Sequence, residues 1–172
     1  MYLIYPKAKP NACHLALAKL EEMGKLKAIV TQNIDGLHQA AGSKKVYELH
    51  GCVLRNYCMD CQTFYDVGYV LETNGVPKCK KCGGIVKPDV VLYAEGLDEQ
   101  IISDAINAIT KADTLIIGGT SLVVYPAAGL IDYFKGRHLV LINKSSTLVD
   151  HKADLVIHEE IAKVMKEAVA NL

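Results

Sequence analysis

The sequence predicts an α/β fold in which helices cover both faces of a parallel sheet and a small metal-binding module interrupts the chain. Three observations predict it. Short apolar runs alternate with helical patterns, as in parallel sheets. Between Cys52 and Glu95 this alternation disappears and Cys, Gly and Lys become frequent, and two Cys-x-x-Cys pairs lie inside that stretch. We therefore expect one domain formed by residues 1–51 and 96–172, and a module formed by residues 52–95.

The first half of the chain predicts one helix and two strands. The helix is expected in "NACHLALAKLEEMGK", where Asn11 can cap the start and Gly24 can end it. Strands are expected at "KAIVTQ" and "KVYEL" because both runs are apolar and rich in β-branched or aromatic residues. The residues expected on the apolar face of the helix are Ala12, Ala16, Leu20 and Met23.

Helices and strands alternate again after the module. A helix capped by Asp98 is expected in "DEQIISDAINAITKAD", with Ile102, Ala105, Ile109 and Ala112 along one stripe. The strand "TLIIGG", the helix "PAAGLIDYFKG" with Pro126 in its first turn, the strands "HLVLIN" and "ADLVI", and the closing helix "EEIAKVMKEAVANL" follow.

Charge and hydropathy exclude several classes of function. The 172 residues carry 19 basic and 19 acidic side chains, which argues against binding to nucleic acid or a membrane surface through net charge. No run of 18 apolar residues predicts a membrane span. The start of the chain does not resemble a secretory signal, so we expect the six cysteines in a reducing, cytoplasmic compartment.

The cysteine spacing is the strongest chemical signal. Cys58 and Cys61 are separated by two residues, as are Cys79 and Cys82, and seventeen residues lie between the pairs. Four thiolates at this spacing predict a tetrahedral zinc site, and the alternatives are two disulfides or four free thiols. Because four thiolates leave no open position, the zinc is expected to be structural.

Outside these pairs, two cysteines receive no chemical role. Cys13 is expected to be a small buried apolar residue, and Cys52 to be either buried or close to a site.

Polar residues follow three of the predicted strands. Asn33 and Asp35 come after "KAIV", Thr120 and Ser121 follow two glycines after "TLII", and Asn143 ends "HLVLIN". The carboxyl ends of parallel strands are where open sheets bind ligands, although polar loops with local turns have the same composition. The lone His50 in "YELHG" is, by itself, most simply a satisfied core histidine.

Taken together, "TQNIDGLH", "YELHG", "CMDC…CKKC", "KPDVVLYAE", "GGTSLVVYP" and "LIN" occur in the order found in sirtuins, and the chain resembles that family from about Lys9 to its end. Sirtuins are NAD-dependent protein lysine deacylases with a large Rossmann-like domain and a small zinc module. The resemblance implies NAD as cofactor, structural zinc, and an acyl-lysine protein or peptide as partner.

The resemblance also implies roles for individual residues. His50 is the implied general base, and Asn33 and Asp35 are implied to take part in catalysis. Cofactor contacts are implied for Gln32, Asn33, Ile34, Asp35, Gly119, Thr120, Ser121, Asn143 and, less directly, Ile161. The two edges of the peptide cleft match Val91, Leu92, Tyr93, Ala94 and Glu95 on one side and Leu122, Val123 and Val124 on the other.

The implied reaction explains why a histidine suits this position. The acyl oxygen attacks the ribose carbon that bears nicotinamide, and a base then takes a proton from a ribose hydroxyl. Imidazole, with an unperturbed pKa of about 6.5, is adapted to that step. The products are free lysine, nicotinamide and acyl-ADP-ribose.

The chain departs from the family pattern at its start. No Gly-Ala-Gly-x-Ser loop, which cradles the NAD phosphates in the family, occurs in the sequence. The strand before that loop lies in the middle of the family's sheet, so we expect unpaired edges beside the strands ending at Gln32 and Gly118 and weak NAD binding by this chain alone.

Two functions follow: an enzyme completed by a separate N-terminal fragment or an upstream segment, or a non-catalytic zinc-bearing module that binds protein or peptide.

A smaller departure from the family pattern is Ala94, because glycine is usual before the glutamate that corresponds to Glu95.

Overall fold

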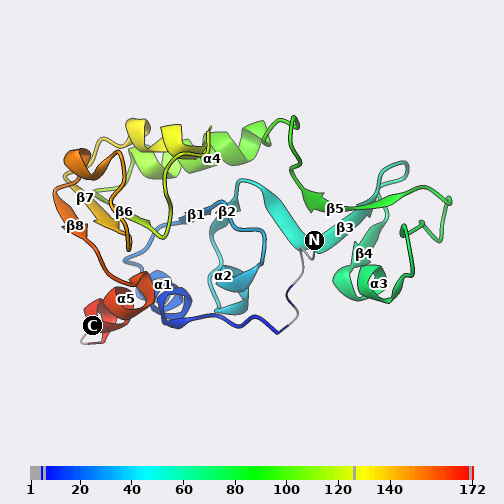
Figure 1. The fold of residues 1–172 in the computed structure, drawn as a ribbon, viewed down its shortest axis with the longest axis horizontal. Coiled ribbons are helices and arrows are strands. Elements are labelled where there is room, and N and C mark those ends of the chain that lie inside the picture. Colours follow the sequence, from blue (N-terminus) through cyan, green and yellow to red (C-terminus); the bar gives the residue numbers. More distant parts are fainter. Residues whose placement is uncertain (1–4, 6, 126, 171) are drawn as a thin grey trace. The chain divides into compact units, whose positions relative to one another are not determined.

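The computed structural model describes residues 5, 7–125, 127–170 and 172, so the predicted position of Pro126 lies outside the described residues. The chain forms two compact units (Figure 1). Unit 1 contains Thr31–Gly36 and Glu48–Leu97 together with the described residues up to Ala8, and unit 2 contains Lys9–Val30, Leu37–Tyr47 and Asp98–Leu172. Across the described residues, no helix has both the length and the apolar character needed to cross a membrane.

Unit 2 contains the parallel sheet that the sequence predicts. Strands β6 (Thr114–Gly118), β7 (His138–Ile142) and β8 (Leu155–Ile157) pair in that order, all parallel. Figure 1 shows α4 (Glu99–Thr110) and the 3₁₀ helix η1 (Ala127–Tyr133) on one face of this sheet. Helices α1 (Ala12–Glu22) and α5 (Ile161–Val169) lie together on the other. The α/β class with a parallel sheet is confirmed.

Helix α1 begins where its capping residue predicts. The Asn11 side chain accepts hydrogen bonds from the amides of Cys13 (2.9 Å) and His14 (3.2 Å), and the His14 ring accepts one from the Asn11 amide (3.2 Å). This reciprocal arrangement satisfies amides that the first helical turn leaves unpaired.

The buried face of α1 differs in part from the predicted one. Cys13 and Ala16 are buried beside Met165 and Val169 of α5, which confirms Cys13 as a buried apolar residue. Met23 is 40% exposed, so its place on the apolar face is wrong. The helix ends at Glu22, and Met23 is the C-cap, where the helical spacing no longer directs the side chain inward.

Within "PAAGLIDYFKG", the residues Ala127–Tyr133 form a 3₁₀ helix where an α-helix is expected. Helix α4 agrees with its prediction: Asp98 accepts a hydrogen bond from the Ile101 amide (2.9 Å), and Ala105 and Ile109 are buried. The short 3₁₀ helix η2 (Asp150–Lys152) precedes β8.

Strands β1 (Ile29–Thr31) and β2 (Val46–Glu48) pair in a sheet of two strands, with the single turn of α2 (Leu37–Ala40) between them in sequence. Among the residues described, β1 has β2 as its strand neighbour and β6 has β7. The expected open edges beside these two strands are therefore seen.

Unit 1 contains an antiparallel sheet whose apolar core is small at the cysteine end. Strand β3 (Gly51–Cys58) is central, between β4 (Phe64–Asp66) and β5 (Val86–Val90), and α3 (Val67–Glu72) follows β4. The buried cluster at its far end consists of Cys58, Cys79 and Val86. Two of these three residues are cysteines, so apolar burial contributes little around the cysteine cluster, and the other buried apolar residues of this unit are Leu49, Cys52 and Val53 among those described.

Gly51, the first residue of β3, occupies a position that no side chain fits. Its φ is +75°, and an added Cβ would lie 2.0 Å from the carbonyl oxygen of Asp89 in β5. The glycine after His50 is thus required by close pairing of β3 with β5, where Gly51 is opposite Val90.

We expect Gly51→Ala to lower the free energy of unfolding of unit 1 by about 2–5 kcal/mol, from left-handed backbone strain and overpacking together. The matched control is Gly75→Ala, with φ +91° and no atom within 4 Å of the added Cβ. It carries the strain alone and should cost about 1–2 kcal/mol. Urea unfolding of zinc-loaded protein measures both, and equal losses would contradict the steric argument.

Candidate functional site

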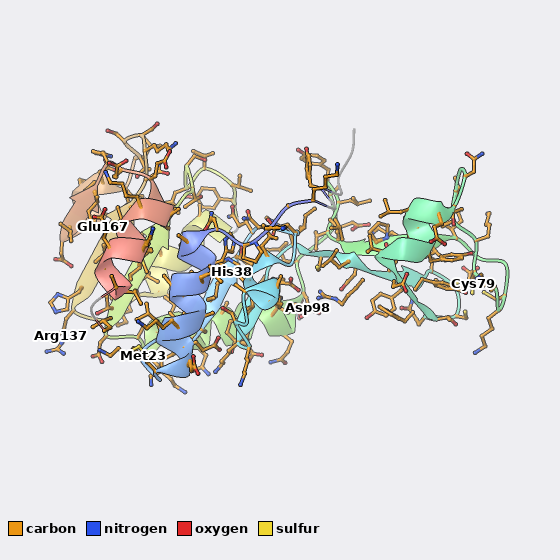
Figure 2. All side chains as sticks on the ribbon, turned by 90° about the horizontal axis from the view of Figure 1, so that it is seen from below. Met23, His38, Cys79, Asp98, Arg137 and Glu167 are labelled. Atoms are coloured by element: carbon orange, nitrogen blue, oxygen red, sulfur yellow. The ribbon has the colours of Figure 1, made fainter. Side chains whose placement is uncertain are left out.

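Cys58, Cys61, Cys79 and Cys82 meet at one end of unit 1. Their sulfur atoms all lie within 4.8 Å of one another, and three of the sulfur pairs are 3.4–3.5 Å apart (Figure 2, where Cys79 is labelled). A zinc ion at about 2.3 Å from four sulfurs separates them by about 3.8 Å, so this cluster fits a tetrahedral zinc ion closely. All four cysteines are free, which excludes the two disulfides that the sequence left open.

Two similar turns present these sulfurs. In the first, the Gln62 amide donates to the Cys58 carbonyl (3.0 Å), and in the second the Gly83 amide donates to the Cys79 carbonyl (2.9 Å). Gln62 and Gly83 both have positive φ, +57° and +81°. Each Cys-x-x-Cys pair is therefore followed by a residue with left-handed backbone, and the turn brings its two sulfurs to the same side.

The surroundings of the Cys79 and Cys61 sulfurs favour thiolates. The Tyr65 hydroxyl donates to the Cys79 sulfur (3.2 Å), and this hydrogen bond lowers the pKa of Cys79 to about 5. The Thr63 hydroxyl lies 3.1 Å from the Cys61 sulfur and lowers the pKa of that thiol. Cys82 behaves differently. The Gly84 amide lowers its pKa, but the contacts with the Cys61 and Cys58 sulfurs outweigh this and raise that pKa to about 12. Because zinc binds the thiolate form, Cys79 and Cys61 would hold the ion readily at neutral pH, whereas Cys82 would lose its proton as the ion binds.

Metal analysis of the purified protein should find about one zinc per chain. Cys79→Ser should lose it, and unit 1 should then unfold, because a module with so small a core depends on the metal. Cys13→Ser is the control, since Cys13 lies in α1 outside the cluster. Absence of zinc, or amide exchange in β3 that stays protected after zinc is lost, would argue against a structural metal.

His50 lies in the turn between β2 and β3 and is held from two sides. Its ring Nδ1 lies 3.0 Å from the Gln32 carbonyl oxygen, and its own carbonyl accepts from the Val91 amide (3.1 Å). A carbonyl oxygen only accepts, so Nδ1 carries the proton and Nε2 of the neutral ring keeps its lone pair. The half-buried imidazole is therefore oriented as a base.

The loop that contains Gln32, Asn33, Ile34 and Asp35 lies beside β3 in the same unit. The Asn33 amide donates to the Thr31 hydroxyl (3.1 Å), and the Val53 amide donates to the Ile34 carbonyl (2.9 Å). Gly36 ends the loop with φ +70°, and an added Cβ there would lie 2.7 Å from Leu54. The structure thus brings this loop and His50 together.

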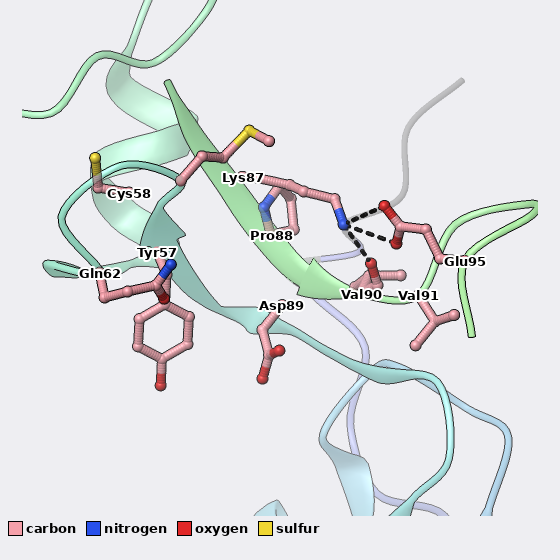
Figure 3. A pocket seen from close by; sticks show the side chains of 10 residues that line it. Tyr57, Cys58, Gln62, Lys87, Pro88, Asp89, Val90, Val91 and Glu95 are labelled. Carbon is pink, nitrogen blue, oxygen red and sulfur yellow. Dashed lines mark hydrogen bonds and ion pairs between the residues drawn. The ribbon is translucent and has the colours of Figure 1, made fainter. Parts of the chain in front are cut away.

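The segment Val91–Glu95 follows β5 and is held by an ion pair. Lys87 donates to both carboxylate oxygens of Glu95 (2.9 and 2.8 Å), as Figure 3 shows, and so lowers the pKa of that carboxyl. The amide of Leu92 also donates to Glu95 (2.8 Å) and lowers the same pKa. Ala94 has φ +68°, which explains why glycine suits this position. Tyr93 is fully exposed. A shallow cavity of about 260 Å³ lies beside this segment and is lined by Lys87, Asp89, Val91 and Glu95 among others.

A second cavity, of about 320 Å³, lies in unit 2 at the carboxyl end of β7. It brings together Gly119, Asn143 and Ile161, whereas Thr120 and Ser121 do not line it. An added Cβ at Gly118 would lie 2.0 Å from Ile161, so glycine lets α5 approach the end of β6.

Leu122, Val123 and Val124 follow β6 in unit 2. Val123 and Val124 are exposed, and Leu122 has a positive φ of +55°.

Several residues around these sites were not predicted from the sequence. The cavity in unit 2 is also lined by Asn11, Glu159 and an ion pair between Lys144 and Glu160 (2.6 Å). Lys144 directly follows Asn143, so adjacency to a predicted residue was the one available signal. In unit 1, Glu48 and Arg55 were missed because charged side chains in strands carry no motif.

The chain combines a parallel α/β sheet with a four-cysteine cluster that fits a zinc ion, and these two features define a zinc-bearing α/β protein. Comparison with known proteins identifies the family: residues 1–126 match the model of the Sir2 family, and the chain belongs to that family.

This chain matches about two thirds of the length of its curated relatives. The NAD-dependent protein deacetylase of Clostridium perfringens is 74% identical over 168 residues, which are 97% of this chain and 69% of the relative. The NAD-dependent protein deacetylase of Clostridium acetobutylicum is 66% identical over the same shares.

Solved structures agree. A Sir2 complex with a p53 peptide and NAD⁺ has a TM-score of 0.88 and 41% identity, covering 96% of this chain and 71% of that chain. Sir2 bound to an acetylated peptide has a TM-score of 0.89 and 40% identity over the same shares.

Proposed function

We propose that this protein is an NAD-dependent protein lysine deacetylase that releases nicotinamide and acetyl-ADP-ribose. The observation that carries the proposal is the hydrogen bond from His50 Nδ1 to Gln32, which joins the "ELHG" and "TQNID" motifs within one unit. The activity named for relatives up to 74% identical supports it.

His50 acts as the general base in this proposal. Its protonated Nδ1 donates to the Gln32 carbonyl, so Nε2 is free to take a proton from a substrate hydroxyl. The imidazolium formed after that transfer keeps the same hydrogen bond, which strengthens when the donor is charged. The Gln32 carbonyl thus both orients the ring and stabilises the state that follows proton transfer.

Bound NAD supplies the ribose carbon that nicotinamide leaves and the hydroxyl that receives the acyl group. Gln32, Asn33, Ile34 and Asp35 serve its nicotinamide side, with Asn33 and Asp35 as further catalytic residues. Asn143 and Ile161 serve the adenosine side, supported by the cavity that both residues line. Gly119, Thr120 and Ser121 bind the phosphates and adenosine through small side chains and backbone amides.

The substrate is an acyl-lysine peptide in extended form. Val91, Leu92, Tyr93, Ala94 and Glu95 form one edge of its cleft, and Leu122, Val123 and Val124 form the other, so that the peptide adds as a strand. The exposure of Tyr93, Val123 and Val124 supports this assignment, because large apolar side chains in water suit a binding surface.

We also propose a cytoplasmic location for the protein, because reduced thiolates at a zinc site are consistent with a reducing compartment.

The direct test is release of nicotinamide and deacetylation of an acetyl-lysine peptide. It is run with the chain alone and with an added polypeptide that carries the family's Gly-Ala-Gly-x-Ser segment. Activity that depends on this addition would identify the segment as a partner, and calorimetry of NAD binding in both arms shows whether the cofactor site needs it.

We expect His50→Ala to lower deacetylation turnover by about 10²–10⁴-fold, the range for loss of a general base. Peptide affinity should be unchanged, because the cleft residues do not use the imidazole. Nicotinamide exchange should fall less than deacetylation, since the base acts mainly after the bond to nicotinamide has broken.

Asn33→Ala is the companion variant, and it should impair nicotinamide cleavage itself. Deacetylation that survives His50→Ala in an active preparation would return His50 to a packing role and refute its assignment as the base.

A further inference from the structure

One arginine in unit 1 binds two carboxylates from different strands. Arg55 of β3 donates from a terminal guanidinium nitrogen to Glu48 of β2 (2.8 Å) and from Nε to Asp89 of β5 (2.9 Å). The two bonds use different nitrogens, so both can exist at once. We call these three residues the Arg55 bridge.

The two carboxylates differ in burial, and the more buried one, Glu48, needs a cation beside it. The Glu48 side chain is 7% exposed, whereas that of Asp89 is 44% exposed. Burial raises the pKa of the neighbouring Cys52 thiol, and the charge of Glu48 adds to the effect. A buried carboxylate without a cation is costly, and Arg55 supplies that cation.

The position of the bridge relates it to His50. Glu48 is two residues before His50, and Asp89 is two residues before Val91, whose amide donates to the His50 carbonyl (3.1 Å). Between these points Gly51 pairs with Val90, and Cys52 pairs with Asp89. The guanidinium therefore ties together the two backbone segments that the His50–Val91 hydrogen bond also joins.

Only an arginine suits this geometry. Its planar guanidinium presents donors at fixed angles, so that fixing one carboxylate also fixes the other. A lysine has one ammonium on a flexible stem and can neutralise Glu48, but it cannot hold both carboxylates in a set relation.

From this geometry we infer that Arg55 is a positioning residue for the proposed base. Through Glu48 and Asp89 it holds the His50 turn against the Val91–Glu95 segment, and thereby fixes the imidazole relative to that segment. The inference rests on the proposed function for its catalytic consequence, but not for its structural one.

The test uses Arg55→Lys, which keeps a charge for Glu48, and Asp89→Ala, which removes the half-exposed end. Asp132→Ala is the control, because Asp132 also forms an ion pair, with Lys152 (3.0 Å), but in unit 2 and away from the bridge residues. Two readouts need no catalysis: hydrogen exchange of the Val91 amide and the His50 tautomer from imidazole ¹⁵N shifts. Zinc content and the melting temperature are measured on every variant.

We expect Arg55→Lys and Asp89→Ala each to lower protection of the Val91 amide about tenfold, the effect of one net hydrogen bond, and to reduce the Nδ1-protonated population of His50. Zinc content should stay constant. The double variant should match either single one, because both break the same bridge. Unchanged protection and tautomer, additive effects, or an equal response to Asp132→Ala would overturn the inference.

Activity separates this inference from the proposed function. In an active preparation, the single variants should lower kcat for deacetylation more than they lower the rate of nicotinamide exchange. The KM for NAD should stay unchanged. Equal losses in both reactions would indicate general destabilisation and overturn a positioning role. If the unaltered protein is inactive while the amide and tautomer respond as expected, the proposed function fails and the bridge stands as a structural device.

Discussion

The four thiolates at the end of β3 are the interaction on which unit 1 depends. Their sulfur atoms lie close enough to share one ion, and around them the buried apolar cluster is small. Four negative charges at this spacing repel one another strongly without a cation. The metal removes this repulsion and holds the two cysteine turns together, so it stabilises the part of the unit with the smallest core. Strand β3 connects this metal site to His50: it ends at Cys58 and begins at Gly51, the residue after His50.

The position of His50 is set by backbone contacts on both sides. Its ring is bound to the Gln32 carbonyl, and its own carbonyl is bound to the Val91 amide. Neither partner is a titratable side chain, so these contacts persist when the imidazole gains or loses a proton. A side chain that is oriented by backbone atoms can change its charge without changing its position, which suits the role of base that we propose for His50.

Charged side chains supplement the backbone pairing in unit 1. Lys87 binds both oxygens of Glu95, and that carboxylate also accepts from the Leu92 amide, which closes the turn after β5. These groups are partly exposed, so each contributes modestly to stability. Their importance is geometric: they determine the shape of the Val91–Glu95 segment in which Ala94 adopts a positive φ.

The sequence by itself determined the elements and sites whose signals are local. The spacing of Cys58, Cys61, Cys79 and Cys82 predicted their cluster, because two residues between cysteines bring both sulfurs to one side of a turn. Asn11 and Asp98 marked helix starts because capping acts over three residues. The order of motifs identified the family, and the alternation of apolar strands with helices predicted the parallel sheet.

Only the tertiary structure decided what depends on contacts between distant residues. Arg55 lies 34 positions from Asp89, and nothing in the sequence around either residue indicates that they meet. The exposure of Met23 and the 3₁₀ form of Ala127–Tyr133 depend on where a helix ends and what packs against it, which helical periodicity does not encode. The tautomer of His50 was likewise decided by Gln32, eighteen residues earlier, because a side chain's hydrogen-bond partner is chosen by the fold and not by its neighbours in the chain.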